Sequence, residues 1–115
     1  MQNSGDMVLD VSKRGTACIL RLAGAIGMNE ACALGVQLEK LVQQPQALVI
    51  IDMEHLDFLC SSGLGALIDA HAKARPFDGE VRIAGPSQMV KRLLETTRLT
   101  NLFAVFPSVD DALNA

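Results

Sequence analysis

The chain has 115 residues, half of them hydrophobic, which suits one compact domain with a sizeable core. Ten basic and thirteen acidic side chains leave a formal charge of −3, and phenylalanine is the only aromatic residue type, so nucleic acid is not an expected partner. The longest aliphatic run, LVII at 48–51, is far too short to cross a membrane, and the N-terminus has neither a basic patch nor a long apolar core. We therefore expect a soluble, cytoplasmic protein that does not contact a membrane.

The cysteines, Cys18, Cys32 and Cys60, are odd in number and widely spaced, and no two of them form a CxxC pair. This pattern predicts neither a disulfide framework nor a zinc knuckle. We expect reduced thiols, and we expect the domain to carry no metal and no cofactor.

The N-terminal part of the chain predicts a β-hairpin. Residues 7–12 alternate apolar and polar side chains, and residues 13–15 (KRG) supply a turn. The run TACILRLA at 16–23 is apolar enough for a central strand. Two strands joined by a tight turn is the simplest interpretation.

A helix and a buried strand follow the hairpin. Apolar residues at helical spacing predict a helix over 29–44, with Asn29 as its cap and Pro45 at its end. The run ALVII at 47–51 is short, β-branched and apolar on both faces, which is typical of a covered parallel strand. Residues 54–60 are interpreted as the loop that follows this strand.

The second half of the chain alternates between helix and strand. The segment 58–74 (FLCSSGLGALIDAHAKA) passes from apolar residues into a helical pattern. The residues predicted to share the inward face of this helix are Leu64, Leu67, Ile68 and Ala72. Residues 80–84 (EVRIA) predict another strand.

The C-terminal part adds a helix, a short strand and a last helix. Pro86 opens the first of these helices, residues 103–106 form the strand, and Pro107 starts the terminal helix, which runs to 113. The inward residues of the first helix are predicted to be Val90, Leu93 and Leu94. The sum is one α/β domain over 1–115, with a mixed sheet of four to five strands packed with about four helices.

Two adjacent serines, Ser61 and Ser62, stand where the chain turns from the buried strand into a helix. Open α/β sheets usually place their functional groups at this carboxyl end of a strand, so we expect Ser62 to lie exposed in the first turn of the helix. One serine could simply cap the helix, which contributes about 1 kcal/mol. Gly63 and Gly65 are harder to explain in this way, because glycine costs close to 1 kcal/mol inside a helix. Small residues here would let a partner's surface or a phosphate-transferring active site come close.

Familiar catalytic motifs are absent around the serines. The nucleophile elbow G-x-S-x-G lacks its leading glycine, because Leu59 and Cys60 stand two residues before Ser61 and Ser62. Neither of the two common glycine-rich nucleotide motifs occurs. An enzyme that used Cys60 or Ser62 as nucleophile and His55 as base would have no recognisable oxyanion device or orienting group. We therefore assign no catalytic residue.

The remaining candidates for chemistry are a group of possible metal ligands, the thiol of Cys60 and the imidazole of His71. Glu54, His55, Asp57 and Cys60 are metal ligands by type, but they have no repeated ligand spacing, which favours solvated or capping side chains. Cys60 could be redox-sensitive beside a helix start, although a small buried residue is the simpler role. His71 lies at helical spacing from two leucines and is interpreted as a half-buried packing residue.

The segment LVIIDMEHLDFLCSSGLGALIDAHAKA resembles the STAS domain family, and within it the single-domain anti-sigma factor antagonists of bacteria. Its buried strand, its loop with alternating apolar residues, its S-S-G-L-G and its helix are similar to the family's pattern around D-S-S-G-L-G. LRLAGAI resembles the family's strand and G-x-[IL] turn, and EVRIAGPSQMVKRLLETTRLTNLFAVFPSVDDAL resembles its ending. The resemblance covers about residues 8–113.

In family members the second serine of this motif is phosphorylated by a partner kinase that is also the anti-sigma factor. The resemblance therefore implies that Ser62 is the phosphoacceptor and Ser61 a helix cap or geometric support. The implied supporting or partner-binding residues are Cys60, Ser61, Gly63, Leu64 and Gly65. The implied partners are an anti-sigma factor and serine kinase of the histidine-kinase-like ATPase type, and a serine phosphatase.

The implied function is partner switching in transcription control. The unphosphorylated domain would bind the anti-sigma factor and release its client sigma factor, and phosphorylation would reverse this. The alternative within the same fold is an unphosphorylated STAS scaffold in a larger signalling assembly. Two positions bear on this choice: the family's acidic residue before the serine pair is Cys60 here, and its aspartate after the G-x-[IL] turn is Gly27.

Overall fold

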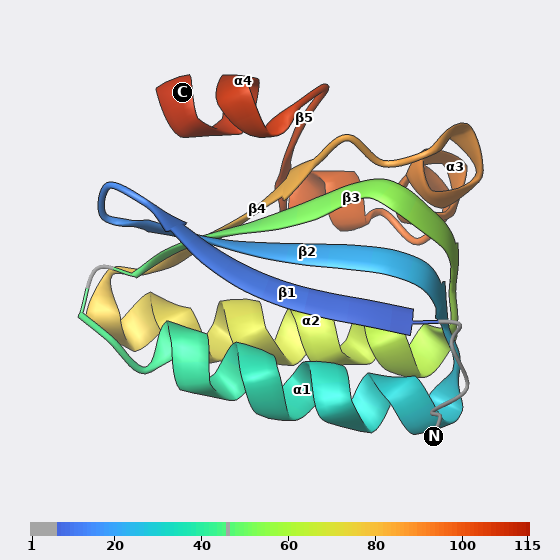
Figure 1. Ribbon diagram of the computed structural model, residues 1–115, viewed down its shortest axis with the longest axis horizontal. Helices are drawn as coiled ribbons and strands as arrows, with labels where there is room; N and C mark the ends of the chain where they lie inside the picture. The colour runs from blue at the N-terminus through green and yellow to red at the C-terminus, as the bar shows by residue number, and fades with distance from the viewer. Residues whose placement is uncertain (1–6, 46) are drawn as a thin grey trace.

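Within residues 7–45 and 47–115, which the computed structural model describes, five strands form one sheet in chain order (Figure 1). The strands are β1 (Met7–Arg14), β2 (Ala17–Ile26), β3 (Leu48–Leu59), β4 (Glu80–Ala84) and β5 (Ala104–Phe106). β1 pairs antiparallel with β2, and every later pair is parallel. The predicted hairpin and mixed sheet are confirmed.

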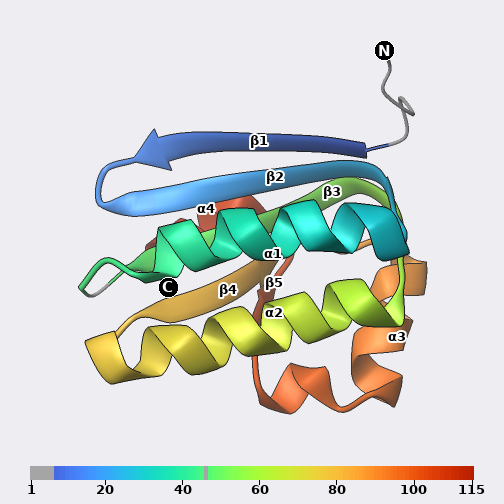
Figure 2. The ribbon, with the colours of Figure 1, turned by 90° about the horizontal axis from the view of Figure 1, so that it is seen from below.

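Four α-helices occur in the same described residues. They are α1 (Met28–Val42), α2 (Ser61–Ala74), α3 (Gln88–Thr96) and α4 (Val109–Asn114), and the short 3-10 helices are η1 (Arg75–Phe77) and η2 (Leu99–Asn101). α1 and α2 lie side by side over one face of the sheet, and α4 covers part of the other face (Figures 1 and 2). No helix in this part of the chain has the length and hydropathy needed to cross a membrane.

The core has two layers because the central strands are apolar on both faces. Val49 and Ile51 of β3 belong to the larger cluster, which lies between the sheet and α1, α2 and α3. Ile50, one residue out of phase, belongs to the smaller cluster, under Ala112 of α4. The expectation of a strand covered on both sides is confirmed, and it follows from the two-residue period of a strand.

The predicted loop at 54–60 is wrong, because β3 continues to Leu59 and pairs with β2 along its whole length. Two register shifts, between Arg21 and Ala23 and between Gly24 and Ala25, each put one extra residue into β3. Such bulges break the alternation of buried and exposed residues. The buried residues of this half of β3 therefore recur at every third position, Met53, Leu56 and Leu59, which does not resemble a strand in sequence.

The predicted helix caps also need correction. α1 begins at Met28 after an N-cap at Gly27, so Asn29 lies inside the helix and caps nothing. The Glu30 carboxylate accepts a hydrogen bond from the Gly27 N–H at 2.9 Å, which stabilises the chain at the exit from β2. α1 ends at Val42, before the proline that was expected to stop it.

The last two helices are capped by serines rather than opened by prolines. The Ser87 hydroxyl accepts from the Val90 N–H, and the Ser108 hydroxyl accepts from the Asp111 N–H. α3 and α4 therefore start at Gln88 and Val109, each one residue after its serine. In both cases the proline precedes the serine, and the serine side chain satisfies an amide that the helix leaves unpaired.

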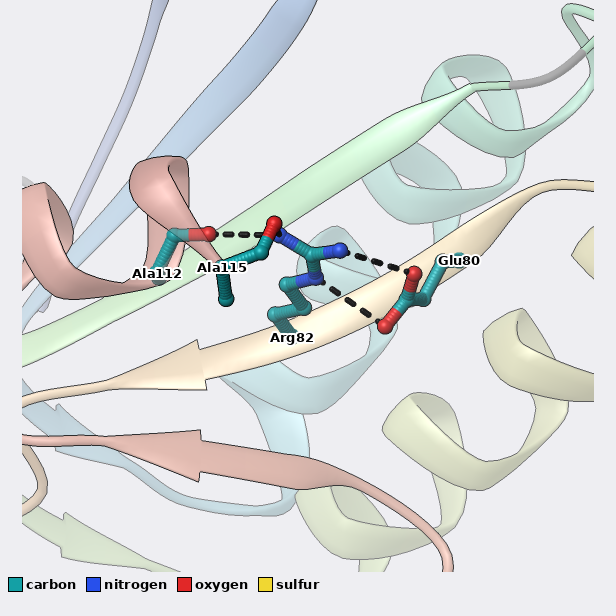
Figure 3. A network of polar contacts seen from close by, with 4 residues as sticks. All are labelled: Glu80, Arg82, Ala112 and Ala115. Atoms are coloured by element: carbon teal, nitrogen blue, oxygen red, sulfur yellow. Dashed lines mark hydrogen bonds and ion pairs between the residues drawn. The ribbon is translucent and has the colours of Figure 1, made fainter.

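Arg82 of β4 holds α4 against the sheet (Figure 3). Its Nη1 donates to the Ala112 carbonyl at 2.6 Å and to the Ala115 carbonyl at 3.5 Å. Its Nε and Nη2 donate to the two carboxylate oxygens of Glu80 at 3.0 and 3.1 Å. The Arg82 side chain is only 15% exposed, so these bonds form in a partly desolvated setting.

Candidate functional site

β3 brings the two serines to the surface at the start of α2. Cys60 has an extended conformation (φ −81°, ψ 172°) and is the N-cap, and Ser61 and Ser62 are the first residues of the helix. The Leu64 N–H donates to the Cys60 carbonyl at 3.1 Å, which is the first helical bond. The prediction that Ser62 lies exposed in the first turn is confirmed.

Of the two roles predicted for Ser61, a helix cap or a geometric support, the cap is wrong. No side chain caps α2, because the chain enters the helix one residue before Ser61. A cap residue has an extended backbone, from which its side chain reaches back to the free amides, and Ser61 already has the helical geometry. Within the described residues neither serine hydroxyl has a hydrogen-bond partner in the protein, so neither has a structural task that the geometry reveals.

The two glycines of the motif differ in their surroundings. A Cβ on Gly63 would lie 2.5 Å from Leu59 Cδ1 and 3.2 Å from Ile26 Cγ2, so a side chain there would force these two side chains or the helix to shift. Gly65 is exposed, and a Cβ on it would meet nothing within 4 Å. Gly63 is therefore explained by packing inside the domain, whereas Gly65 is not.

The buried face of α2 differs in part from the prediction. Leu64 and Leu67 are buried against the sheet as expected. Ile68 is 40% exposed and Ala72 is exposed, so both were assigned to the wrong face. The inward stripe continues through Ala70 and Ala74 instead. Because the buried residues of α2 are spaced mostly three residues apart, Ile68 and Ala72 lie at the solvent-exposed side of the buried face.

The starts of α1 and α2 are neighbours. The Cys60 N–H donates to the Ile26 carbonyl at 2.9 Å, which ties the end of β3 to the end of β2. Gly27 and Cys60, the two positions that depart from the family's acidic pattern, are thus the N-caps of adjacent helices. A Cβ on Gly27 would lie 2.9 Å from Glu30 Oε1, so the Glu30 carboxylate takes up the space of a side chain at 27.

Glu30 was not identified from the sequence, although a signal was present. A glutamate three residues after a helix cap commonly reaches back to the cap's N–H, as Glu30 does here. With the cap predicted at Asn29, Glu30 is only one residue away, and the three-residue spacing is visible only from the observed cap at Gly27. One carboxylate is therefore present at the start of α1, which adjoins the start of α2, although it comes from a different position than the family pattern indicates.

Large exposed apolar side chains gather at this end of the sheet. Met28 is 78% exposed at the start of α1, Met89 is 65% exposed in the first turn of α3, and Phe58 is 48% exposed near the end of β3. We refer to Met28, Phe58 and Met89 as the apolar rim. None of the three can be recognised from the sequence, because each stands alone in its own segment of the chain.

The structure does not assemble an enzyme or metal site from the other candidates. Glu54, His55 and Asp57 are exposed on β3. At ~3.3 Å per strand residue, His55 lies roughly 15 Å before Cys60, too far to act as a base for Cys60 or for the serines. In the part of the chain that is described, no group of three or more His, Cys, Asp or Glu side chains could hold a metal ion.

His71 on α2 packs edge-on against Phe103, with ring centroids 5.4 Å apart and planes at 73°. Both of its ring nitrogens are buried without a hydrogen-bond partner. Burial, and then the positive charge of Arg75, lower the pKa of His71 below its usual value, against an opposing effect of Glu80. The imidazole is therefore a half-buried packing group, as the sequence indicated, and it favours the neutral form.

The family model that matches the chain is that of the STAS domain, over residues 8–112. The chain belongs to the STAS domain family. The predicted fold, an α/β domain with a mixed sheet of four to five strands and about four helices, is confirmed, because the described residues of this STAS domain form five strands and four α-helices. The S-S-G-L-G segment lies at the start of α2, inside the matched region.

Similar proteins include several anti-sigma factor antagonists. The anti-sigma F factor antagonist of Paenibacillus polymyxa is 26% identical over 98 residues, which are 84% of this chain and 81% of that protein. The crystal structure of an anti-sigma factor antagonist from Mycobacterium paratuberculosis is 25% identical in sequence and has a TM-score of 0.80. The match spans 99% of this chain and 97% of that protein. The structure of the phosphorylated form of the Bacillus cell fate determinant SpoIIAA has a TM-score of 0.74 at 16% sequence identity. The match spans 93% of this chain and 97% of SpoIIAA.

Proposed function

We propose that this STAS domain is an anti-sigma factor antagonist and that phosphorylation of Ser62 controls its binding to an anti-sigma factor. The observation that carries the proposal is the position of Ser62, which is exposed in the first turn of α2 and whose hydroxyl makes no hydrogen bond to any other described residue. A hydroxyl in this position is accessible to a kinase and does not stabilise the fold through a hydrogen bond. The antagonists among the similar proteins support the assignment.

Phosphorylation at this position would leave the fold intact. The first turn of α2 contains no acidic residue, so a phosphate there meets no like charge within the turn. The helix dipole and the free amides favour an anion at a helix start by roughly 0.3 to 1 kcal/mol. The regulatory effect must therefore lie in what the surface binds, not in whether the domain folds.

The size of the effect is sufficient for a switch. A phosphoserine carries about −1.5 to −2 charges at neutral pH. Burying such a charge in an interface without a cation costs several kcal/mol, which is comparable with the ~5.5 kcal/mol that moves a two-state population from one extreme to the other. One phosphate on Ser62 would then separate the domain from a partner that covers the start of α2.

The proposed partners are proteins of the cytoplasm. One is an anti-sigma factor that is also a serine kinase of the histidine-kinase-like ATPase type, which binds the unphosphorylated domain and releases its client sigma factor. The other is a serine phosphatase that restores the unphosphorylated state. The STAS domain would itself catalyse nothing, and its partners would supply both the phosphate and the hydrolysis.

The residues around Ser62 would have distinct supporting roles. Leu64 is buried and Gly63 packs against the sheet, so these two hold the helix start in place. Gly65 faces open space on the surface, which leaves room for a partner's backbone. Cys60 sets the extended turn that precedes the helix, and Ser61 lies exposed beside Ser62.

An unphosphorylated scaffold is the second candidate, and one observation favours it. The helix caps on either side of the site are Gly27 and Cys60, where the family pattern has acidic residues. The Glu30 carboxylate, which accepts a hydrogen bond from the Gly27 N–H, favours the phosphorylated antagonist instead. It supplies a negative charge at the cap of α1, where the family pattern has an aspartate.

The test is incubation of the full chain with ATP and the anti-sigma factor kinase encoded in the same genome, followed by mass spectrometry of the peptide that contains both serines. We expect one phosphate on Ser62 and none on Ser62→Ala. In a pull-down, Ser62→Ala should bind the anti-sigma factor whether or not ATP is present. Phosphate on Ser61, or an unmodified peptide together with ATP-independent binding by the unaltered chain, would leave the scaffold as the better account.

A further inference from the structure

We propose that two copies of this domain associate through the outer edge of β1, with the two β1 strands antiparallel and related by a two-fold axis at Ser12. β1 is the first strand of the sheet, and β2 is the only described strand that pairs with it (Figure 2). The other edge of β1 is therefore open to a further strand. The inference does not depend on the proposed function.

The hairpin determines which backbone groups β1 presents at this edge. Arg14 pairs with Ala17, so a turn of two residues joins β1 to β2. The pair that closes such a turn exchanges both backbone hydrogen bonds, and hydrogen-bonded pairs then recur at every second residue. Even-numbered residues in the range 10–14 therefore bond their backbone to β2. The backbone N–H and C=O groups of Val11 and Lys13 point outward instead, toward the open edge.

Charge selects the register of a second β1 strand. In a two-fold antiparallel pair centred on Ser12, Asp10 of each copy faces Arg14 of the other, and Val11 faces Lys13. An axis at Asp10 would set two aspartates opposite each other, which is destabilising. An axis at Val11 would set Asp10 opposite Ser12 and leave both charges without an opposite charge facing them. Ser12 is the centre about which the charges of β1 complement themselves.

Both charged side chains are available for this pairing. Asp10 and Arg14 are exposed, and they project from the same face of β1 because an even number of residues separates them on a strand. Asp10 makes no ion pair with any other described residue, although Arg21 faces it on β2. Arg14 Nη2 contacts Asp110 Oδ1 at 3.4 Å, with both side chains more than half exposed. The guanidinium has further N–H donors for a second carboxylate.

The same charges make a second copy of this chain the fitting occupant of the edge. Charged side chains on an edge strand usually repel a further strand. On β1 the two charges have opposite signs and lie equally far from Ser12, so an antiparallel copy of the same strand is attracted. A two-fold contact occupies the β1 edge of both copies, so association ends at a dimer. The ladder has only about four backbone hydrogen bonds, so we expect a weak dimer that depends on concentration.

The experiment is sedimentation equilibrium of the full chain from about 1 µM to 1 mM. We expect a monomer–dimer equilibrium for the wild type. Asp10→Arg and Arg14→Asp should each weaken association at least ~10-fold, because like charges then face each other on both sides of the axis. A mixture of the two variants should form a heterodimer, because two arginines of one chain then face two aspartates of the other. The double variant Asp10→Arg/Arg14→Asp should associate like the wild type.

Two controls separate the edge contact from other effects of these substitutions. Asp110→Asn removes the contact of Arg14 within the domain and leaves the edge unchanged, so it should associate like the wild type. Ser62→Asp should also associate like the wild type, because β2 lies between the paired edge and β3, which leads to Ser62. Urea unfolding of each variant checks that the domain is folded.

Disulfide cross-linking checks the register. The background is Cys32→Ser, which removes the exposed native thiol. Ser12→Cys should form a disulfide between two copies under mild oxidation, because the side chains of a facing pair without backbone hydrogen bonds come close enough. Asp10→Cys and Val11→Cys should cross-link at least ~10-fold less, because position 10 faces position 14 and position 11 faces position 13.

A wild type that stays monomeric over the whole range, no heterodimer in the mixture, or stronger cross-linking at position 10 or 11 than at 12 would overturn the inference. A monomeric wild type whose Asp10→Arg variant binds the anti-sigma factor more weakly would make that protein the occupant of the edge, which also overturns it. None of these results bears on phosphorylation of Ser62, so the inference and the proposed function can fail separately.

Discussion

The backbone N–H of Cys60 donates to the carbonyl of Ile26 at 2.9 Å, and this bond sets the starts of α1 and α2 side by side. Because β2 and β3 are parallel, their carboxyl ends meet at one edge of the sheet. The serines, Glu30, Met28 and Phe58 all lie within a few residues of this bond along the chain, whereas Met89 comes from the start of α3. The predictions below concern this edge and the helix that leaves it.

Charge at position 62 should change binding without changing stability. Ser62→Asp adds an acid in the first turn of α2, where the dipole favours it by about 0.3 to 1 kcal/mol, so urea unfolding should show no loss. The same variant should bind the anti-sigma factor at least ~10-fold more weakly, because its charge would be buried in the interface. Ser61→Ala should alter the free energy of unfolding by less than ~0.5 kcal/mol, because Ser61 makes no cap bond. Tight binding by Ser62→Asp would argue against the switch.

The two glycines of α2 should respond in opposite ways to alanine. Gly63→Ala pushes a methyl group into Leu59 and Ile26 and should cost about 1 to 3 kcal/mol of stability, less a helix-propensity gain of up to ~1 kcal/mol. Gly65→Ala meets nothing and should stabilise the domain by about 0.5 to 1 kcal/mol. If a partner approaches the backbone at Gly65, the same variant should bind it more weakly despite being more stable. Chemical denaturation and titration of both variants check this, and unchanged affinity would limit Gly65 to a neutral surface position.

Restoring an acid at the cap of α2 should not impair phosphorylation. Cys60→Asp replaces a residue that makes no cap bond with one that accepts well from the free amides, so stability should rise by about 0.5 to 1 kcal/mol. The initial rate of phosphate transfer to Ser62, measured with the cognate kinase, should stay the same or increase. Glu30→Gln keeps the hydrogen bond to Gly27 but removes the charge, and should slow the transfer if this carboxylate replaces the family's acid. A slower rate for Cys60→Asp would contradict the assignment.

Stability should fall in mild acid because of His71. Its pKa is lower in the folded chain than the value of 6.5 usual for the unfolded chain, so the unfolded chain binds the proton more readily. The contribution is fully present above pH 6.5, starts to be lost as the pH falls below that value, and is lost completely once the pH is below the folded pKa. We expect His71→Leu to lose less stability than the wild type between about pH 7.5 and 5.5, a range in which ordinary carboxyls do not titrate. His55→Gln, at the exposed histidine, should follow the wild type in urea unfolding, and an equal change in both variants would count against this role of His71.

The order of the elements and the position of Ser62 were determined by the sequence alone. Hydrophobic periods of two and of three to four residues distinguish strands from helices, and the glycines and prolines between them mark the boundaries. A strand followed directly by serines and a helical pattern must present those serines at the strand's carboxyl end. For this reason the exposure of Ser62 and the strand Glu80–Ala84 were predicted without error, since both depend on neighbours in the chain.

Only the tertiary structure decided the length of β3, the caps of α1 and α2, and the composition of the surface around Ser62. The bulges in β3 exist because it follows β2, and Cys60 becomes a cap because its N–H is held by Ile26. Phe58 and Met89 are far apart in the chain and line one groove only because β3 and β4 are parallel and end at the same edge of the sheet. The local pattern of apolar residues cannot predict these bulges, caps and surface neighbours, because they depend on pairing between strands that are tens of residues apart in the sequence.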